Sequence, residues 1–306
     1  MGSLISADET FDEHEHACSP IAFEQEAFHC DGDRHASIRV PKGAHLVDLG
    51  LKNKVVLITG GAKGIGAAIA RTIGQEGAIP VIIDRDREAS EELHAELQQF
   101  HGDSYLVVAE LNTAEACFAA VEQTFKKLGR IDALVNNAGV NDRVGLEKGS
   151  PDQFVASLQR NLLHYYNMAH YALPHLKRSA GSIVSISSKT AVTGQGGTSG
   201  YVASKGAILA MTREWAVELL PYGIRVNAVV PAEVMTPLYQ QWLSKFPNPQ
   251  EKLKATVARI PLGKRMTTSE EIAAMVVFLI SCKASHVTGQ HLYVDGGYVH
   301  LDRALT

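Results

Sequence analysis

Hydrophobic residues along most of the chain fall into short runs that alternate with longer amphipathic stretches. From Leu51 onward, short β-branched runs typical of buried strands are separated by stretches with helical periodicity. We predict strands at Val55–Thr59, Ile79–Ile83, Tyr105–Val108, Ala133–Asn136, Ser182–Ile186, Arg225–Val229 and His291–Val294. Helices are predicted at Gly64–Glu76, Glu88–Phe100, Ala114–Leu128, Phe154–Leu176, Val202–Leu220 and Glu270–Ile280. This alternation is typical of an α/β fold whose parallel sheet carries helices on both faces.

The first fifty residues differ in composition from the rest and show no sustained period. Residues 1–33 contain nine acidic side chains and no Lys or Arg. We therefore predict an acidic, poorly ordered extension over 1–50 and one globular domain over 51–306. The extension also contains His and Cys residues whose spacing matches no zinc pattern, so we predict no metal site there: His14, His16, Cys18, His29 and Cys30.

Composition and charge exclude several classes of function. The longest apolar run, Ile272–Ile280, has nine residues, whereas a membrane-spanning helix needs about 20. The first thirty residues lack the basic and apolar segments of a secretory signal. The chain beyond residue 33 carries 24 acidic (33 − 9) and 29 basic residues without a dense cluster, which argues against nucleic acid. Four scattered cysteines indicate free thiols and a cytoplasmic location.

A glycine-rich segment follows the first predicted strand and begins the first predicted helix. It reads Thr59-Gly-Gly-Ala-Lys-Gly-Ile-Gly66. Gly60 permits a tight turn, Gly64 lets the backbone approach a diphosphate, and Gly66 allows close packing of helix against strand. The helix N-terminus then offers free N–H groups to phosphates. The segment indicates a dinucleotide site, although a glycine-rich turn without a ligand has the same pattern.

The second predicted strand is followed by an acidic residue, Asp84, eighteen residues beyond Gly66. A carboxylate there accepts hydrogen bonds from the adenosine ribose hydroxyls and repels a 2′-phosphate, which favours NAD over NADP. Lys63 and Arg85 lie nearby in the sequence and would accommodate a phosphate, so NADP stays open. Asp84 would otherwise simply begin the next loop.

Tyr201 and Lys205 are four residues apart at the start of a predicted helix, which places them on one helix face. A free tyrosine has a pKa of about 10, and an ammonium about 4 Å away favours the phenolate by up to about 4 kcal/mol at an effective dielectric of about 20. Burial opposes part of this effect. We therefore predict that Lys205 lowers the pKa of Tyr201 enough for proton exchange with an alcohol near neutral pH. An exposed pair on an ordinary helix has the same spacing.

A serine stands just past the strand that precedes this helix. Ser188 lies thirteen residues before Tyr201, where its hydroxyl would polarise a carbonyl or hold an alcohol. Ser187 is the rival for that role, and either residue would also serve as a local cap or turn residue.

Together these motifs resemble the short-chain dehydrogenase/reductase family. The matching segments are spread in order over about 250 residues: Thr59–Gly66, Asn136-Asn-Ala-Gly139, Asn161, Ser188, Tyr201-Val-Ala-Ser-Lys205, Arg225-Val-Asn-Ala-Val229 and Val294-Asp-Gly-Gly297. The resemblance implies a single Rossmann-type, doubly wound sheet of seven parallel strands. It also implies an NAD(P)-dependent oxidoreductase that transfers a hydride.

The resemblance implies roles for individual residues. Tyr201 is expected to be the general acid/base, Lys205 to lower its pKa and bind the nicotinamide ribose, and Ser188 to orient the substrate. Asn161 would hold the water that continues the proton relay beyond Lys205. Glu110 departs from the family's usual Asp beside the expected adenine contact, Leu111. The implied cofactor contacts are Gly60, Lys63, Gly64, Ile65, Gly66, Asp84, Leu111, Asn137, Gly139, Tyr201, Lys205, Val234 and Thr236.

The segment after the sixth predicted strand departs from the family pattern. The family usually has Pro-Gly where this chain reads Pro231-Ala-Glu-Val-Met-Thr-Pro237, so Glu233 would lie beside the reaction site. A carboxylate there suits a ligand with several hydroxyls and disfavours an acyl chain. The polar residues Asp142, Arg143, His164 and Thr190 are expected nearby. We predict a sugar substrate bound by Asn141, Ser188, Lys189, Gln195, Tyr201 and Glu233.

Several segments add a closer resemblance, to bacterial L-fucose dehydrogenases. They are Asn137–Asp142, His164–Tyr166, Ser187–Gln195, Pro231–Pro237 and Gly297–Leu305. This resemblance implies oxidation of the C1 hydroxyl of L-fucose, or of a related aldose such as L-galactose or D-arabinose, to the lactone. A homotetramer is usual for the family. The tail residues Tyr298, His300, Asp302 and Arg303 are expected to reach an active site, in the same subunit or a neighbour.

Other functions on the same scaffold stay open. A deoxy-sugar-acid dehydrogenase or a 3-oxoacyl reductase would use the same chemistry. The oxoacyl reductase would prefer NADP, and Asp84 and Glu233 both count against it. A non-catalytic dinucleotide sensor is disfavoured because Ser188, Tyr201 and Lys205 are all present with Asn161.

Overall fold

The computed structural model describes residues 47–100 and 102–301. The predicted extension therefore lies outside the described residues except for 47–50, and so do its His and Cys residues and the tail residues Asp302 and Arg303. Within 47–50, Leu49 packs against the core, and its carbonyl accepts a hydrogen bond of 3.1 Å from the Cys282 amide. The domain boundary at residue 50 stays a prediction.

Seven strands form one sheet in which every neighbouring pair is parallel. The order is β3-β2-β1-β4-β5-β6-β7, which confirms the predicted doubly wound fold. All seven predicted strands are present, with β2 and β6 ending slightly later than expected: β1 (Val55–Thr59), β2 (Ile79–Asp84), β3 (Tyr105–Val108), β4 (Ala133–Asn136), β5 (Ser182–Ile186), β6 (Arg225–Pro231) and β7 (His291–Val294). The strand order reverses between β1 and β4, and ligands of such sheets bind outside the carboxyl ends of the strands at that point.

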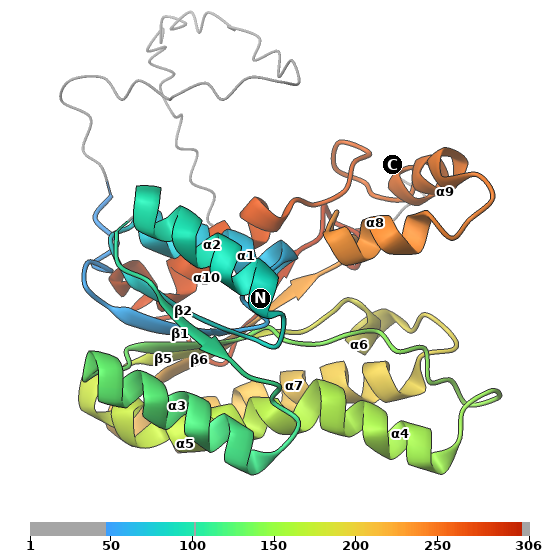
Figure 1. Cartoon of the computed structure of the whole chain (residues 1–306). Helices are drawn as coiled ribbons and strands as arrows, with labels where there is room; N and C mark the ends of the chain where they lie inside the picture. The colour runs from blue at the N-terminus through green and yellow to red at the C-terminus, as the bar shows by residue number, and fades with distance from the viewer. Residues whose placement is uncertain (1–46, 101, 302–306) are drawn as a thin grey trace, which may run out of the picture. The chain divides into compact units, whose positions relative to one another are not determined.

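Helices cover both faces of this sheet (Figure 1). One face carries α1 (Gly64–Gln75), α2 (Arg87–Phe100) and α10 (Ser269–Ile280). The other carries α3 (Ala114–Leu128), α4 (Pro151–Leu158), α5 (His164–Ser179) and α7 (Ser199–Glu218). The side chains of β1 divide accordingly. Val56 and Ile58 pack with α1 and α10, whereas Val55 and Leu57 pack with α3 and α5. Because both faces are covered, the strands read as continuous apolar runs rather than as alternating ones.

The predicted helix Phe154–Leu176 is in fact two helices joined by a π-helical turn. α4 ends at Leu158, the turn spans Gln159–Leu163, and α5 begins at His164. Single π turns are found disproportionately at functional sites because they change the direction of a side chain within a helix. Here the turn carries Asn161. Apolar periodicity does not reveal such a turn because it shifts the pattern by only one residue.

Among the described residues, three short α-helices are not predicted by the sequence pattern: α6 (Thr190–Thr193), α8 (Pro237–Leu243) and α9 (Pro249–Val257). Both α8 and α9 have proline in their first turn and a side-chain cap. Thr236 accepts a hydrogen bond from the Tyr239 amide, and Asn248 accepts one from the Glu251 amide, each at 3.2 Å. These start signals were available in the sequence. α8 and α9 pack on each other more than on any other element and stand apart from the two helix layers (Figure 1). We refer to residues 237–257 as the α8–α9 arm.

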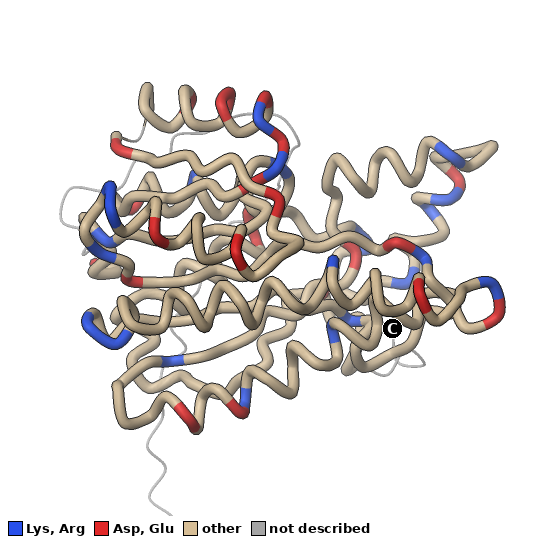
Figure 2. Tube along the Cα trace, turned by 60° about the horizontal axis from the view of Figure 1, so that its bottom comes forward, with Lys and Arg blue, Asp and Glu red and all other residues tan. Residues whose placement is uncertain are grey.

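Charged residues of both signs are interspersed over the described chain rather than gathered on one face (Figure 2). Several are paired across elements. Arg71 of α1 binds Glu96 of α2 through two hydrogen bonds of 2.6 and 2.7 Å. Arg265 likewise binds Glu271, which also caps α10.

Candidate active site

A cleft of about 700 Å³ opens at the carboxyl ends of the central strands. Its lining contains all but one of the residues expected to contact a dinucleotide: Gly60, Lys63, Gly64, Ile65, Asp84, Leu111, Asn137, Gly139, Tyr201, Lys205, Val234 and Thr236. The exception is Gly66, which is buried. A Cβ at Gly66 would lie 2.1 Å from the Gly60 carbonyl oxygen, so this glycine serves the packing of α1 on the turn rather than contact with a ligand.

The turn at the start of α1 fits a diphosphate. Gly60 and Gly64 have φ angles of 61° and 53°, in the left-handed region that favours glycine. A Cβ at Gly60 would come within 2.9 Å of the Ala138 Cα. The N-cap residue of α1, Lys63, makes no side-chain capping bond, so the first amides of the helix keep their hydrogen-bonding capacity. Such amides at the positive end of the helix dipole bind phosphates.

Asn137 holds this turn in place. Its side-chain amide donates to the carbonyl oxygens of Thr59 and Gly60, both at 3.0 Å. The Thr59 hydroxyl in turn accepts hydrogen bonds from the backbone amides of Asn137 and Ala138 at 2.9 and 3.1 Å. The loops after β1 and β4 are therefore fixed relative to each other, and they form the floor of the cleft.

The end of the cleft beside Asp84 holds two ion pairs. Lys63 lies 2.6 Å from Asp86, and Arg85 lies 2.9 Å from Glu110. Hydrogen bonds from these cations lower the pKa of both the Asp86 and the Glu110 carboxyls. The two basic residues that left NADP open in the sequence thus each have an acidic partner.

The structure separates the two candidate serines. The Ser187 hydroxyl donates to the Lys205 carbonyl oxygen at 2.8 Å and so has a structural role. Both serines line the cleft, but it is Ser188 that accepts a hydrogen bond of 3.0 Å from the Thr190 hydroxyl and hydrogen-bonds the Tyr201 phenol. Ser188 is therefore the serine placed beside Tyr201.

The Lys205 ammonium makes its hydrogen bonds to groups other than Tyr201. Its Nζ donates to the Ile186 carbonyl oxygen at 2.8 Å and to the Tyr165 hydroxyl at 3.0 Å. It lies 5.6 Å from the centre of the Tyr201 ring. Tyr165 is fully buried, and the sequence reasoning gave it no such role. No local signal marks it, because its partner stands forty residues away.

The predicted lowering of the Tyr201 pKa is wrong for this structure. Burial raises the pKa of the Tyr201 phenol, and its hydrogen bond with Ser188 only partly opposes that shift. Burial also lowers the pKa of Lys205 to about 7. Removing both groups from water disfavours their charged forms, which outweighs the attraction that the four-residue spacing suggested.

Asn161 lies behind the cleft rather than in its wall. Its side chain accepts a hydrogen bond of 2.7 Å from the Val140 amide and donates one of 3.2 Å to the Ser157 carbonyl oxygen. Gly139 separates it from Lys205. A Cβ on that glycine would lie 3.3 Å from the Asn161 Oδ1 and 3.4 Å from the Lys205 Nζ. The side chain is thus close to Lys205, and its place in a proton relay stays a prediction.

His164 faces the same cleft from α5. Its Nε2 lies 3.1 Å from the Ala138 carbonyl oxygen. Burial lowers its pKa to about 4, so the imidazole is neutral at physiological pH and donates to that carbonyl. His164 therefore holds the loop after β4 in place and, being neutral, does not balance a charge on a ligand.

A second cavity, of about 1210 Å³, is lined by all six residues predicted to contact a sugar: Asn141, Ser188, Lys189, Gln195, Tyr201 and Glu233. Ser188 and Tyr201 also line the first cleft, so they stand where the two cavities meet. Of the described tail residues, Tyr298 lines the second cavity, whereas His300 lines neither cavity and contacts Tyr293 edge to face.

Glu233 is already paired within the protein. Its carboxylate forms an ion pair with Lys189, and these side chains are only 17% and 10% exposed. The Lys189 ammonium lies 3.9 Å from the centre of the Tyr298 ring, and Tyr239 hydrogen-bonds Glu233. Glu233 and Lys189 were both predicted at the substrate site, but their pairing was not predicted. Glu233 is one member of a charged wall built from residues far apart in the sequence.

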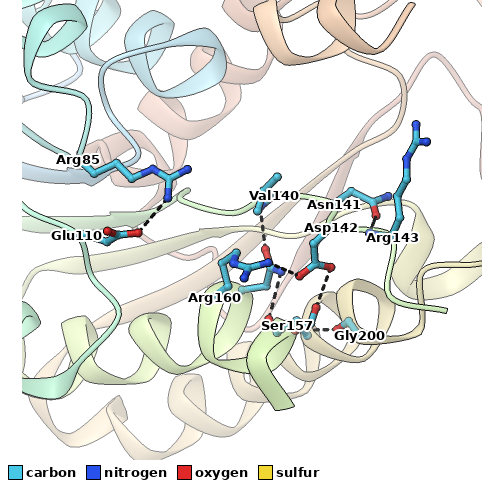
Figure 3. A network of polar contacts seen from close by, with 11 residues as sticks. Arg85, Glu110, Val140, Asn141, Asp142, Arg143, Ser157, Arg160 and Gly200 are labelled. Atoms are coloured by element: carbon cyan, nitrogen blue, oxygen red, sulfur yellow. Dashed lines mark hydrogen bonds and ion pairs between the residues drawn. The ribbon is translucent and has the colours of Figure 1, made fainter. Parts of the chain in front are cut away.

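The loop after β4 is anchored through Asp142 (Figure 3). Asp142 accepts hydrogen bonds of 2.9 Å from both the Ser157 hydroxyl and Arg160. Arg143 points away from this cluster and has a left-handed φ of 58°, with its amide donating to the Asn141 side chain at 3.2 Å. Asp142 lines the second cavity and Arg160 lines the first, so their ion pair connects the two.

The arrangement of glycine turn, Ser188, Tyr201 and Lys205 agrees with a comparison against protein families. Residues 60–299 match the family model described as enoyl-(acyl carrier protein) reductase. The chain belongs to the short-chain dehydrogenase/reductase family. It is accordingly a dehydrogenase or reductase that uses a nicotinamide dinucleotide and acts on a small molecule.

Individual relatives differ in their substrates. An L-fucose dehydrogenase of Bos taurus is 37% identical over 80% of this chain and 88% of its own length. Among solved structures, the dehydrogenase Cj0485 is 49% identical, with a TM-score of 0.82 over 85% of this chain and 99% of its own. A 3-ketoacyl-(acyl carrier protein) reductase from Brucella melitensis, solved with NADH, is 33% identical with a TM-score of 0.73, over 81% of this chain and 99% of its own.

Within residues 47–100 and 102–301, no helix has both the length and the apolar character needed to cross a bilayer.

Proposed function

We propose that this member of the short-chain dehydrogenase/reductase family oxidises the C1 hydroxyl of L-fucose, or of a closely related aldose, to the lactone. The observation that supports this most directly is the wall beside Tyr201. There the Lys189–Glu233 ion pair, Asn141 and Gln195 line one cavity and offer donors and acceptors to several hydroxyls. An acyl chain would remove the remaining water from the largely buried Lys189–Glu233 pair without offering it hydrogen bonds, which is unfavourable.

The cofactor proposed is NAD. Asp84 stands at the end of β2 in the cleft, where its carboxylate suits the ribose hydroxyls. A 2′-phosphate would also meet Asp86 and Glu110, which hold Lys63 and Arg85 in ion pairs. The carboxylates therefore outnumber the cations here, which disfavours the additional negative charge of NADP.

The chain's own residues supply the proton chemistry of the proposed reaction. The bound dinucleotide provides the hydride acceptor. Ser188 donates a hydrogen bond to the anomeric oxygen of the sugar. This contact directs the O–H of the anomeric hydroxyl toward Tyr201. Tyr201 in its phenolate form takes that proton as the C1–H bond breaks and the C1–O double bond forms. The Lys205 Nζ lies 5.6 Å from the centre of the Tyr201 ring, and in its protonated form it stabilises the phenolate. Tyr165 holds the Lys205 ammonium in this position.

We also propose a homotetramer in the cytoplasm. Support for association comes from partly exposed apolar side chains on α3, the π-helical turn and α5. Phe118, Leu163 and Tyr166 are 48%, 46% and 54% exposed. Apolar side chains that gather on a surface are typical of contacts between protein subunits. Support for a reducing compartment comes from Cys117 and Cys282, which are free thiols in the described part of the chain. Light scattering coupled to size exclusion tests the assembly.

The deciding experiment mixes purified enzyme with NAD or NADP and a panel of substrates, and follows the absorbance of the reduced nicotinamide. The panel contains aldoses, polyols, deoxy-sugar acids and 3-hydroxyacyl thioesters. We expect turnover of L-fucose with NAD. Tyr201→Phe should lower kcat by several orders of magnitude while the dinucleotide still binds. Turnover of sugar acids or thioesters without turnover of aldoses would refute the proposed substrate and preserve the family chemistry.

A further inference from the structure

Three aromatic side chains follow one another along the α8–α9 arm. Tyr239 and Trp242 are in edge-to-face contact, with ring centres 5.0 Å apart. Trp242 and Phe246 are in the same arrangement at 4.8 Å. We call Tyr239, Trp242 and Phe246 the aromatic row. All three line the second cavity, and none is fully buried.

Lys252 of α9 stabilises the row. Its ammonium lies 5.6 Å from the Trp242 ring centre and 5.0 Å from that of Phe246. Cation–π contacts of this kind fix an aromatic side chain without covering its remaining surface. The row is therefore held by side chains of the arm itself, and it still presents apolar surface to the cavity.

The cavity thus has two chemically different sides. Polar groups at the carboxyl ends of the strands, notably Lys189 and Glu233, form one side near Tyr201. The aromatic row on the arm forms the other and adjoins the first where Tyr239 hydrogen-bonds Glu233. Protein sites that bind small ligands combine apolar and aromatic lining with a few placed polar groups. An aldopyranose matches this division because its hydroxyls lie on some edges of the ring, while its C–H groups leave an apolar patch.

We propose that the aromatic row is the subsite for the apolar part of a 6-deoxyaldose, with Trp242 contacting the C5 methyl group and the adjacent C–H bonds. This inference rests on the proposed oxidation of an aldose at C1. It explains why the arm carries a tryptophan toward the cavity, where uncovered apolar surface is unfavourable until a ligand removes it from water. It also assigns discrimination at C5 to the arm and recognition of the hydroxyls to the polar side that contains Lys189 and Glu233.

Three sugars of the same ring configuration test the C5 position. L-Fucose carries a methyl group there, L-galactose a hydroxymethyl group and D-arabinose a hydrogen atom. Removal of a methyl-sized group from an apolar contact typically changes kcat/KM by about 10- to 200-fold. We expect the wild-type enzyme to prefer L-fucose over D-arabinose by roughly tenfold or more.

The substitution Trp242→Ala should reduce this preference to below about threefold, mainly by lowering kcat/KM for L-fucose. Trp242→Phe keeps an aromatic ring and should retain an intermediate preference. The matched control is Trp215→Phe, because Trp215 lies on α7 and lines neither cavity. This control should leave the sugar preference unchanged.

A binding measurement avoids any effect of Trp242→Ala on folding of the arm. The chain has two tryptophans, so Trp215→Phe leaves Trp242 as the only indole fluorophore. That variant is titrated with L-fucose in a buffer that contains no NADH. The sugar should shift or quench the Trp242 fluorescence until the signal saturates. D-Arabinose at the same concentrations should give a smaller change.

The outcomes separate this inference from the proposed function. If the wild-type enzyme oxidises L-fucose but Trp242→Ala lowers kcat/KM equally for all three sugars, the arm has only a structural role and the inference is overturned. If the enzyme oxidises L-fucose but the Trp242 fluorescence does not respond to this sugar, the inference is also overturned. If no aldose is oxidised at all, the proposed function itself fails.

Discussion

The Lys189–Glu233 ion pair permits a quantitative test of how the wall of the second cavity is stabilised. The perturbations are Glu233→Gln, Lys189→Met and the double variant. Both charged side chains are largely buried, at 10% and 17% exposure. At a contact of about 3 Å and an effective dielectric of about 20, Coulomb attraction between two unit charges is about 5 kcal/mol. Desolvation of both ions offsets most of that attraction.

Each single variant leaves one charge in the wall with a weaker partner. In Glu233→Gln, Lys189 keeps the face of Tyr298 and an uncharged amide oxygen, and in Lys189→Met, Glu233 keeps the hydrogen bond from Tyr239. Removing one partner of a fully buried pair costs about 3–5 kcal/mol, so for this partly exposed pair we expect about 2–3 kcal/mol of unfolding free energy. The double variant should lose less than the sum of the two, with a coupling energy of about 1–3 kcal/mol.

The assay is urea unfolding of the four proteins, followed by far-UV circular dichroism, with Tm as a second measure. A loss of 2–3 kcal/mol should lower Tm by about 5–10 °C in a domain of this size. The matched control is Glu91→Gln, because the Arg87–Glu91 pair on α2 is 69% and 56% exposed and should contribute about 0.5 kcal/mol or less. A coupling energy within about 0.3 kcal/mol of zero would refute the reasoning that this pair is energetically distinct from a surface pair.

Three further predictions follow from the geometry. Gly66→Ala places a Cβ 2.1 Å from the Gly60 oxygen, so the turn must shift, and calorimetric titration should show NAD affinity reduced by at least about tenfold; unchanged affinity would contradict the packing argument. Burial raises the pKa of Tyr201, so its phenolate becomes more populated as pH rises and initial rates of sugar oxidation should increase between about pH 7 and 10. Lactone reduction uses the protonated phenol, so its rate should not fall through loss of that proton below about pH 10; a flat oxidation profile would exclude Tyr201 as the base. Asp142→Asn should raise KM for the sugar more than for NAD because the loop after β4 loses its ion pair with Arg160, and equal changes in both constants would speak against a positioning role.

Much of the fold could be predicted from local sequence patterns. A strand covered on both faces must be apolar throughout, and an amphipathic helix repeats every 3.6 residues, so both elements are recognisable in short windows. The glycine turn is equally local, since its function depends on residues within one loop. The arm was not predicted because its helices are short and their capping signals, Thr236 with Pro237 and Asn248 with Pro249, stand outside any strong apolar period.

The sequence by itself determined the α/β alternation, the cradle from Gly60 to Gly66 and the placement of Tyr201 and Lys205 on one face of a helix, because each depends on spacing within a few residues. Only the tertiary structure decided which side chains the charged residues of the site bind. Lys189 meets Glu233 across 44 positions, and Lys205 meets Tyr165 across 40. It also decided the direction of the Tyr201 pKa shift, because burial depends on everything that packs around the phenol. Contacts between distant segments and the exclusion of water are properties of the assembled fold, and no local pattern encodes them.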